Sequence, residues 1–376
     1  MSWEYTSLPR AINKYASFPS IAASNNRLFL VYREAGEHSV NAANDGMPCH
    51  HDNESRILFS TSNNTGKTWS TPVEIFKGQF GVNDPAISVL KSGRLLVRVS
   101  EIEVKPSSMR KDLTGRFLNH RSDLGEVSAV IAHSVISSDD LGVSWKEPCR
   151  LDIGNLSNSL SRDPIVELCD GTLVLAVYES TPFKSEECYL VRSWDQGKSW
   201  GDASLIAKDF APINSLYATS SYNESAIVEA SPNNLIALVR CDESYYTNEG
   251  EDYMTVGGVG NLRICYSNNN GLSWSNPRKT NIFGQPAAAI MLDGKTLITA
   301  YAKRAHPYQI CLRTSSDLGQ LWTEEIQIKA GVKHWDFGYP SIAIQAGKIF
   351  IAYYWQNEKG SRHIEVASIA IEDIIS

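Results

Sequence analysis

Acidic residues recur at one position of a repeated pattern in this chain of 376 residues. The pattern is a short apolar segment, a turn and a second apolar segment, and it occurs six times. In a hairpin, the start of the first strand lies beside the end of the second, so residues at these two positions gather at one end. The residues at the start of the six copies are Phe18, Asp84, Asp163, Glu224, Gln285 and Tyr339.

The end of the second apolar segment brings arginine and tyrosine side chains to the same place. These residues are Arg33, Ser100, Tyr178, Arg240, Ala302 and Tyr354, and Arg162 and Asn223 stand one residue before members of the first set. Carboxylates, guanidinium groups and a phenol in one pocket can bind a polar substrate, activate a nucleophile and move protons. The alternative interpretation is that these charges pair with one another and keep an open channel soluble.

A second repeated element, Ser-x-Asp/Asn-x-Gly-x-x-Trp, explains how the strands are joined. This pattern predicts a hairpin turn in which the Asp or Asn side chain bonds backbone amides and the glycine takes a positive φ. The turn belongs at the end of the blade opposite the candidate residues, in a structural role. Its five copies are Ser62–Trp69, Ser138–Trp145, Ser193–Trp200, Ser267–Trp274 and Ser315–Trp322.

The two elements together predict six units of four strands each. One such unit cannot bury both faces, whereas six arranged around an axis can, and closure protects the sheet edges. We therefore expect an all-β, six-bladed β-propeller with four-stranded antiparallel blades, no helix of consequence and a single domain over residues 1–376. The sixth copy lacks the turn element, so the strand His363–Ile371 and the N-terminal residues are expected to complete its blade. Loops 34–55, 101–127 and 241–261 leave from the candidate end and are expected to wall a cleft.

Composition excludes some classes of function. The net charge is −7, which opposes binding to nucleic acid or an anionic membrane, since both need a basic surface. No apolar run approaches the length of a membrane span, and the first residues do not resemble a secretory signal. The seven cysteines include no Cys-x-x-Cys pair. We expect reduced thiols and a cytoplasmic protein.

The fourth copy of the hairpin pattern resembles a segment of the sialidase (neuraminidase) family. This segment reads Asn223-Glu224-Ser225, then Val228-Glu229, then Arg240, sixteen residues after Glu224. The resemblance extends over essentially the whole chain and includes the five turn elements, which are the Asp boxes of that family. It implies the sialidase fold, with Glu224 as a catalytic residue and Arg240 as a ligand of the substrate carboxylate.

Other positions resemble the family one residue at a time. Tyr339, in the sequence GYPSIAI, matches the tyrosine nucleophile. Asp84 matches the aspartate that lines the glycerol or N-acyl side of the pocket. The acid/base aspartate of the family lies in the first-blade loop, where Asp52 stands ten residues before the first Asp box and Asp45 is the alternative.

The arginines depart from the family pattern. The family binds the substrate carboxylate with three arginines, one of which Arg304 or Arg313 would supply, with Arg304 preferred. The Arg-Ile-Pro of the family's first repeat is Ser17-Phe18-Pro19 here. We expect Arg33 or Arg162 to replace the lost arginine, with Arg33 favoured. The departure extends the candidate substrates from sialic acid to related ulosonic acids and to sugars without an anomeric carboxylate.

The resemblance implies a retaining mechanism without a metal or organic cofactor. Tyr339 would attack the anomeric carbon, since a neutral phenol is not repelled by the substrate carboxylate. Glu224 would take the phenol proton, and Asp52 would protonate the leaving oxygen and then activate water. A metal site at Cys49-His50-His51-Asp52 lacks a second group of ligands at a known spacing. The expected substrate-binding residues are Arg240, Arg304, Arg33, Asp84, Asp163, Arg162 and Tyr178.

Three alternatives remain for the function. A hydrolase of neutral sugars, similar to an exo-arabinanase, would use two carboxylates such as Asp163 and Glu224. A trans-glycosidase or lyase would use the same residues as the hydrolase. A non-catalytic propeller that binds glycans would not need the Tyr339–Glu224 pair. Each of these activities implies a glycan or glycoconjugate as the partner.

Overall fold

The protein is a six-bladed β-propeller, as the two sequence repeats predicted. Its computed structural model describes residues 2–9, 15–24, 26–44, 50–113, 116–121, 125–156, 159–179, 186–209, 219–245, 254–255 and 260–375. The chain divides into two compact units, of which unit 1 is Met1–Leu160 with Val332–Ser376 and unit 2 is Ser161–Gly331. Each unit contains three antiparallel blades, numbered here in chain order.

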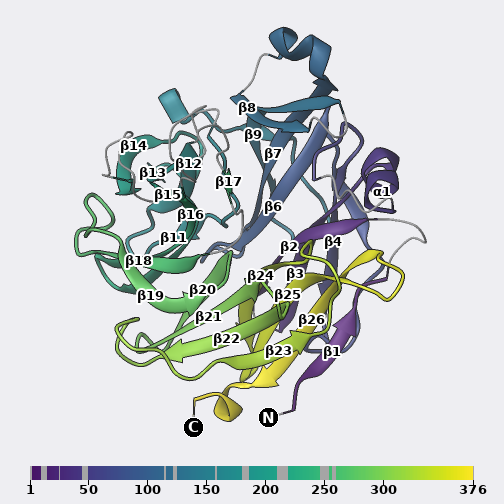
Figure 1. Ribbon diagram of the computed structural model, residues 1–376. Helices are drawn as coiled ribbons and strands as arrows, with labels where there is room; N and C mark the ends of the chain where they lie inside the picture. Colours follow the sequence, from purple (N-terminus) through teal and green to yellow (C-terminus); the bar gives the residue numbers. More distant parts are fainter. Residues whose placement is uncertain are drawn as a thin grey trace. The chain divides into compact units, whose positions relative to one another are not determined.

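Unit 1 contains blades 1, 2 and 6. Blade 1 consists of β2 (Ala16–Ser24), β3 (Arg27–Glu34), β4 (Arg56–Ser62) and β5 (Val73–Phe76). Blade 2 consists of β6 (Gly81–Val89), β7 (Leu95–Pro106), β9 (Glu126–Ser138) and β10 (Cys149–Arg150), and β8 (Arg116–Arg121) pairs with β9. Blade 6 consists of β24 (Gly338–Gln345), β25 (Lys348–Gln356), β26 (Arg362–Ala370) and β1 (Glu4–Ser7) (Figure 1).

Unit 2 contains blades 3, 4 and 5. Blade 3 consists of β11 (Val166–Glu167), β12 (Leu173–Glu179), β13 (Glu187–Ser193) and β14 (Gly201–Ala207). Blade 4 consists of β15 (Thr219–Ser231), β16 (Asn234–Tyr245), β18 (Asn261–Ser267) and β19 (Arg278–Phe283), and β17 (Met254–Thr255) pairs with β16. Blade 5 consists of β20 (Ala287–Leu292), β21 (Thr296–Lys303), β22 (Gln309–Ser315) and β23 (Ile326–Ala330).

The N-terminal strand completes blade 6, as predicted. Tyr5 of β1 pairs antiparallel with Ala367 of β26, and the indole of Trp69 donates to the Thr6 hydroxyl at 3.2 Å. The expected strand His363–Ile371 is β26. The first residues of the chain therefore give the last blade its fourth strand.

The five Asp boxes form the same tight turn between the third and fourth strands of a blade. In the first, Asn64 Oδ1 accepts from the Ser62 hydroxyl and from the Thr68 amide, both at 3.0 Å. The residue before each glycine has φ between +54° and +63°, and each glycine has φ between +73° and +87°. In blade 1, Leu28 pairs with Ser62 at the Asp-box end, whereas Arg33 pairs with Ile57 at the other end. This confirms the predicted turn and its place opposite the candidate residues.

Apolar clusters fill the space between successive blades within each unit. In unit 1, Leu30 of β3 and Phe350 of β25 belong to one buried cluster, and Phe29 and Val97 belong to another. In unit 2, Leu190 and Ala237 lie in one cluster and Ile264 and Leu297 in another. Complete burial of one large apolar side chain contributes about 1.5–3 kcal/mol. The apolar positions of the alternating strand sequences thus stabilise the fold mainly by packing neighbouring blades against each other.

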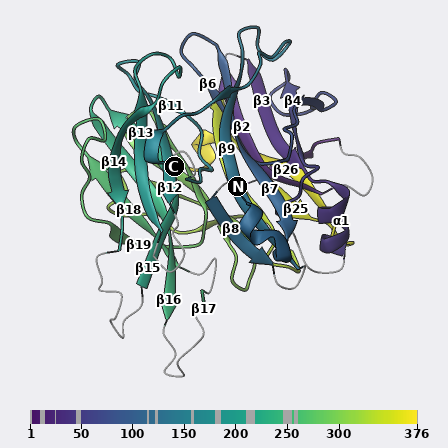
Figure 2. The same ribbon diagram turned by 90° about the horizontal axis from the view of Figure 1, so that it is seen from above.

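The long segments at the candidate end continue the strands further than the sequence indicated. β7 runs to Pro106 and β9 begins at Glu126, and β15 and β16 remain paired to Thr219 and Ser244 (Figure 2). Segment 34–55 includes the helix α1 (Glu37–Asn44), and 3₁₀ turns form at η1 (Ser107–Asp112), η2 (Gly154–Leu156) and η3 (Ile371–Asp373). Among the described residues, no helix combines the length and the apolar character that crossing a membrane requires.

Candidate functional site

The innermost strand of four blades is interrupted where the first set of candidate residues lies. Three of these residues, Phe18, Asp84 and Tyr339, have left-handed backbones with φ of +51°, +46° and +49°. This conformation costs roughly 1–2 kcal/mol for an L residue, and a bulge of this kind changes the direction of a side chain. The pairing breaks lie between Ser17 and Ser20, Asn83 and Ala86, Tyr222 and Ser225, and Gly338 and Ser341.

Tyr339 of unit 1 lies in an aromatic cluster around Phe18. The Phe18 ring meets the Tyr339 ring edge-on at 4.8 Å between centroids, and the His50 ring edge-on at 5.0 Å. The Tyr354 ring lies 5.6 Å from Phe18 and 6.2 Å from Tyr339. Edge-to-face geometry of this kind stabilises aromatic pairs. Tyr339 is 8% exposed, so packing fixes the direction of its side chain.

A buried carboxylate, Asp336, joins this cluster to the blade 6 strands. Its Oδ1 accepts from the Tyr354 hydroxyl at 2.8 Å and lies 2.9 Å from His50 Nε2. Its Oδ2 accepts from the Tyr15 hydroxyl at 2.8 Å and forms an ion pair with Arg362, whose Nε lies 2.9 Å away. Burial raises the pKa of Asp336, but the nearby His50 and Arg362 and the hydrogen bonds outweigh it and hold the pKa well below the usual value. Asp336 is therefore a charged carboxylate that contacts four side chains at once.

Arg33 and Asp52 form a second buried group in unit 1. Arg33 Nη2 donates to Asp52 Oδ2 at 2.6 Å, and the two side chains are 0% and 1% exposed. Ser39 also donates to this oxygen at 2.6 Å, and the amide of Glu54 donates to Oδ1 at 2.9 Å. Arg33 was expected to bind a substrate carboxylate, whereas in the structure it donates to a carboxylate of the protein, Asp52.

The surroundings of Asp52 differ from those that an acid requires. Burial raises the pKa of Asp52, but Arg33 and the hydrogen bonds from Ser39, Glu54 and Gly36 prevail, so its pKa is lowered. A general acid at neutral pH needs a raised pKa, because it must hold a proton before it donates one. The alternative acid, Asp45, lies outside the described residues.

Glu224 and Arg240 of unit 2 lie together, as their spacing predicted. Arg240 Nη1 donates to Glu224 Oε2 at 2.7 Å, and Arg240 Nη2 lies 3.0 Å from Asp242 Oδ2. Burial raises the pKa of Asp242, but Arg240 and the hydrogen bonds lower it overall. The guanidinium group is thus held between two carboxylates, and its plane is fixed.

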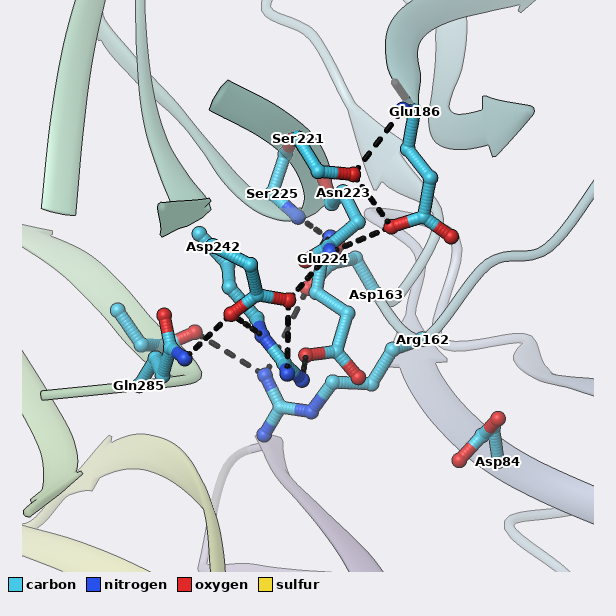
Figure 3. Close-up of polar contacts among 12 residues, drawn as sticks. Asp84, Arg162, Asp163, Glu186, Ser221, Asn223, Glu224, Ser225, Asp242 and Gln285 are labelled. Carbon is cyan, nitrogen blue, oxygen red and sulfur yellow. Dashed lines mark hydrogen bonds and ion pairs between the residues drawn. The ribbon is translucent and has the colours of Figure 1, made fainter. Parts of the chain in front are cut away.

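A chain of hydrogen bonds extends from Asp242 across blades 3, 4 and 5 of unit 2. Asp242 accepts from Gln285 Nε2 at 2.6 Å and from Asn223 Nδ2 at 3.1 Å, as Figure 3 shows. Asn223 Nδ2 also donates to Glu186 Oε2 at 2.6 Å. The predicted first-set residues of these blades therefore belong to one polar network. The network also includes Asp163, whose Oδ2 accepts from the Ser225 amide at 2.9 Å.

The remaining predicted residues of unit 2 have diverse surroundings. Arg162 Nη1 donates to the Ala287 carbonyl at 3.0 Å and lies 3.8 Å from Asp163 Oδ1. Tyr178 packs against the apolar cluster between blades 3 and 4. Arg304 follows β21 directly, whereas Arg313 lies within β22 and donates from Nε to the Tyr301 hydroxyl at 3.1 Å.

Several residues of these networks were not predicted from the sequence. His50 and Asp336 of unit 1 and Asp242 and Glu186 of unit 2 are examples. Buried Arg98 also donates from Nη2 to the Asp84 carbonyl at 2.8 Å and so supports that strained residue. Asp242 stands two residues after Arg240, and this alternation along one strand was a usable signal. The pairing of His50 with Asp336 had no local signal, since 286 residues separate them.

Comparison with solved structures supports the same fold. A protein of unknown function from Dyadobacter fermentans is 22% identical, with a TM-score of 0.80 and 98% of each chain covered. A Hadza microbial sialidase is 18% identical, with a TM-score of 0.66 and coverage of 96% of this chain and 66% of that one. The intramolecular trans-sialidase from Ruminococcus gnavus is 13% identical, with a TM-score of 0.63 and 96% of both chains covered. No curated protein matches the chain in sequence.

The family assignment comes from residues 117–351. These residues match the model of the BNR repeat-like domain, and they make up more than half of the chain. They include four of the five Asp boxes and, in whole or in part, four of the six hairpins that begin the blades. The chain belongs to the BNR repeat-like domain family and has the sialidase fold.

Proposed function

We propose that the protein is an exo-acting glycoside hydrolase that releases a terminal sialic acid or a related ulosonic acid with retention. The observation that carries the proposal is the strained backbone of Tyr339, with φ of +49°. Left-handed backbone in a bulky residue is uncommon and concentrates at functional sites. The same residue is the one that the sialidase resemblance makes the nucleophile.

Tyr339 and Glu224 share the nucleophilic step in this proposal. The phenol oxygen attacks the anomeric carbon while the Glu224 carboxylate takes the phenol proton. A neutral nucleophile suits a substrate that carries its own carboxylate, because two anions would repel each other. Removal of either group is expected to lower turnover by about 10²-fold or more.

Arg240 is proposed to bind the substrate carboxylate together with Arg304. Asp242 and Glu224 hold the guanidinium group in one orientation, and a fixed planar group is well suited to bidentate recognition of a carboxylate. Arg33 is proposed to hold Asp52 and the first-blade loop in place rather than the substrate. The remaining proposed contacts with the sugar are those of Asp84, Asp163, Arg162 and Tyr178.

The charge balance in unit 2 favours a second candidate, a hydrolase of neutral sugars. The network around Asp242 contains two guanidinium groups, Arg162 and Arg240, and four carboxylates, Asp163, Glu186, Glu224 and Asp242. An excess of negative charge repels an anionic sugar and does not affect a neutral one. In this case two carboxylates would perform the chemistry.

A panel of fluorogenic glycosides distinguishes the candidates. The panel contains N-acetylneuraminic acid, Kdn, Kdo and α-L-arabinofuranoside, and the variants are Tyr339→Phe and Glu224→Gln. Tyr353→Phe is the matched control, since Tyr353 lies in β25, the strand that pairs with the β24 strand of Tyr339, and its hydroxyl donates to Glu365 at 3.1 Å. We expect release of an ulosonic acid by the wild type and the control, with loss in both site variants.

Other results would contradict the proposal in different ways. Release of arabinose alone would favour the neutral-sugar hydrolase. Binding of a glycan without turnover, unchanged in Tyr339→Phe, would indicate a glycan-binding propeller. In both cases the fold would stand and the roles of Tyr339 and Glu224 would not.

A further inference from the structure

His50 and Asp336 form a carboxylate–imidazole pair beside the proposed nucleophile. His50 Nε2 lies 2.9 Å from Asp336 Oδ1, with side-chain exposures of 24% and 0%. One ring nitrogen thus faces a buried carboxylate, while part of the imidazole reaches solvent. A histidine held in this way is a frequent proton-transfer group in enzymes.

The surroundings of Asp336 keep it charged and fixed. Tyr15 and Arg362 occupy its second oxygen, and Tyr354 shares the first oxygen with His50. A charged carboxylate accepts the proton on Nε2 and so selects one ring orientation and one tautomer. Nδ1, the other nitrogen, is then the one that can exchange a proton with a bound substrate.

The aromatic cluster contains both this imidazole and Tyr339. Both rings contact Phe18 edge-on, His50 at 5.0 Å and Tyr339 at 4.8 Å between centroids. Phe18, His50 and Tyr339 all belong to unit 1, so these distances hold within one compact unit. The cluster thus places a nucleophile and a proton donor in contact with one phenyl ring.

We infer that His50, oriented by Asp336, is the acid/base residue of this site, in the role that the sialidase resemblance gives to Asp52. This inference rests on the proposed function. The Asp52 carboxylate is occupied by Arg33, Ser39 and backbone amides, whereas the His50 ring is partly exposed. His50 acts on the substrate as a catalytic residue, and Asp336 is a positioning residue.

The two steps balance in protons and bonds. In the first, the His50 imidazolium gives its Nδ1 proton to the glycosidic oxygen as the bond from that oxygen to the anomeric carbon breaks. Tyr339 Oη bonds to the same carbon, and its proton passes to Glu224. In the second, the neutral imidazole takes a proton from water, whose oxygen bonds to the anomeric carbon. The Tyr339 oxygen then leaves and recovers its proton from Glu224.

The charged and titratable groups around His50 come from several elements. Tyr354, Arg362 and Tyr15 contact the Asp336 carboxylate of the pair. The guanidinium groups of Arg33 and Arg362 lie 5.9 and 5.4 Å from the centroid of the Tyr15 ring. The donor must be an imidazolium, so kcat for a poor leaving group should fall on the alkaline side of its pH profile.

The test compares leaving groups on whichever sugar the wild type releases. A 4-methylumbelliferyl glycoside needs little protonation of its leaving oxygen, whereas a methyl glycoside depends on an acid. We expect His50→Gln to lower kcat for the methyl glycoside about 10²-fold or more, to lower the aryl rate less than tenfold and to remove the alkaline fall of the pH profile. Added imidazole should restore part of the methyl glycoside rate. His51→Gln is the control. His51 follows His50 directly in the same loop, and its Nδ1 lies 2.8 Å from the hydroxyl of Ser128 in β9.

Three results would overturn the assignment. The first is an equal loss on both leaving groups, and the second is a selective loss in Asp52→Asn instead of His50→Gln. The third concerns a proton resonance of the hydrogen-bonded imidazole, which the wild type should show and Asp336→Asn should lose. Its absence from the wild type, or its persistence in Asp336→Asn, would overturn the assignment, and this readout does not depend on turnover. An inactive wild type would overturn the proposed function. The first two results require an active wild type, so they separate failure of the His50 assignment from failure of the proposed function.

Discussion

The Arg33–Asp52 pair shows how burial changes the role of a residue. Both side chains are removed from water, so their mutual attraction and the bonds from Ser39 and Glu54 must offset the loss of hydration. A pair of this kind holds its partners rigidly and leaves neither group available to a ligand. We therefore expect it to matter for stability more than for chemistry.

Removal of one member of the pair should be more harmful than removal of both. Asp52→Asn leaves a buried guanidinium without its counter-charge, and we expect it to lower the free energy of unfolding by about 3–5 kcal/mol. The double variant Asp52→Leu with Arg33→Met should recover most of this loss. Urea denaturation measures both values. A single variant within about 1 kcal/mol of the wild type would show that the pair has little structural importance.

At the scale of elements, the Asp-box turns lie at one end of a blade and the bulges lie at the other. Within blade 1, the turn at Ser62 lies at one end of β4, and the strained Phe18 of β2 belongs to the other end. The regular end fixes the register, and the interrupted end presents side chains. The strain at the second end is tolerated because the blades on both sides are packed.

A comparison of an Asp-box glycine, Gly142, with Gly171 in the turn between β11 and β12 separates backbone strain from packing. Gly142 and Gly171 both have φ of +87°, but an added Cβ would lie 2.4 Å from Phe59 Cζ at Gly142 and would meet no atom within 4 Å at Gly171. We expect Gly171→Ala to cost about 1–2 kcal/mol of unfolding free energy from backbone strain. Gly142→Ala should cost about 1–3 kcal/mol more. Thermal and urea unfolding of both variants measures the difference, and equal losses would contradict the packing argument.

At the scale of the whole molecule, β1 joins the two ends of the chain in one sheet. Without it, β26 would be an edge strand with unpaired backbone groups, and such edges promote association. Blade 6 would also lose the hydrogen bond between Trp69 and Thr6. The short N-terminal strand thus protects the strand that follows Tyr339 and Tyr354.

Deletion of residues 2–9 should expose this edge. We expect a lower unfolding temperature and concentration-dependent association, measured by calorimetry and sedimentation. Lys348→Ala is the control, because it removes the exposed Lys348–Glu4 ion pair at 2.8 Å and keeps the strand. A deletion variant that remains monomeric with an unchanged unfolding temperature would show that β26 does not need its neighbour.

The sequence by itself determined the number of blades, the Asp-box turns, the closing strand and the pairing of Glu224 with Arg240. These features depend on contacts within one hairpin or on a repeated pattern, so alternation and turn residues are sufficient to predict them. The same reasoning placed Tyr339 and Asp84 at the candidate end of their blades.

Tertiary structure decided which charged groups meet. Asp52 pairs with Arg33, and Asp336 pairs with His50, because packing across blades sets the direction of a loop or a bulge. The left-handed backbones of Phe18 and Tyr339 also depend on neighbours from other blades, since neither residue favours that conformation locally. Hydrogen-bond partners far apart in the chain leave no local pattern, so the sequence could indicate the candidate residues but not the contacts among them.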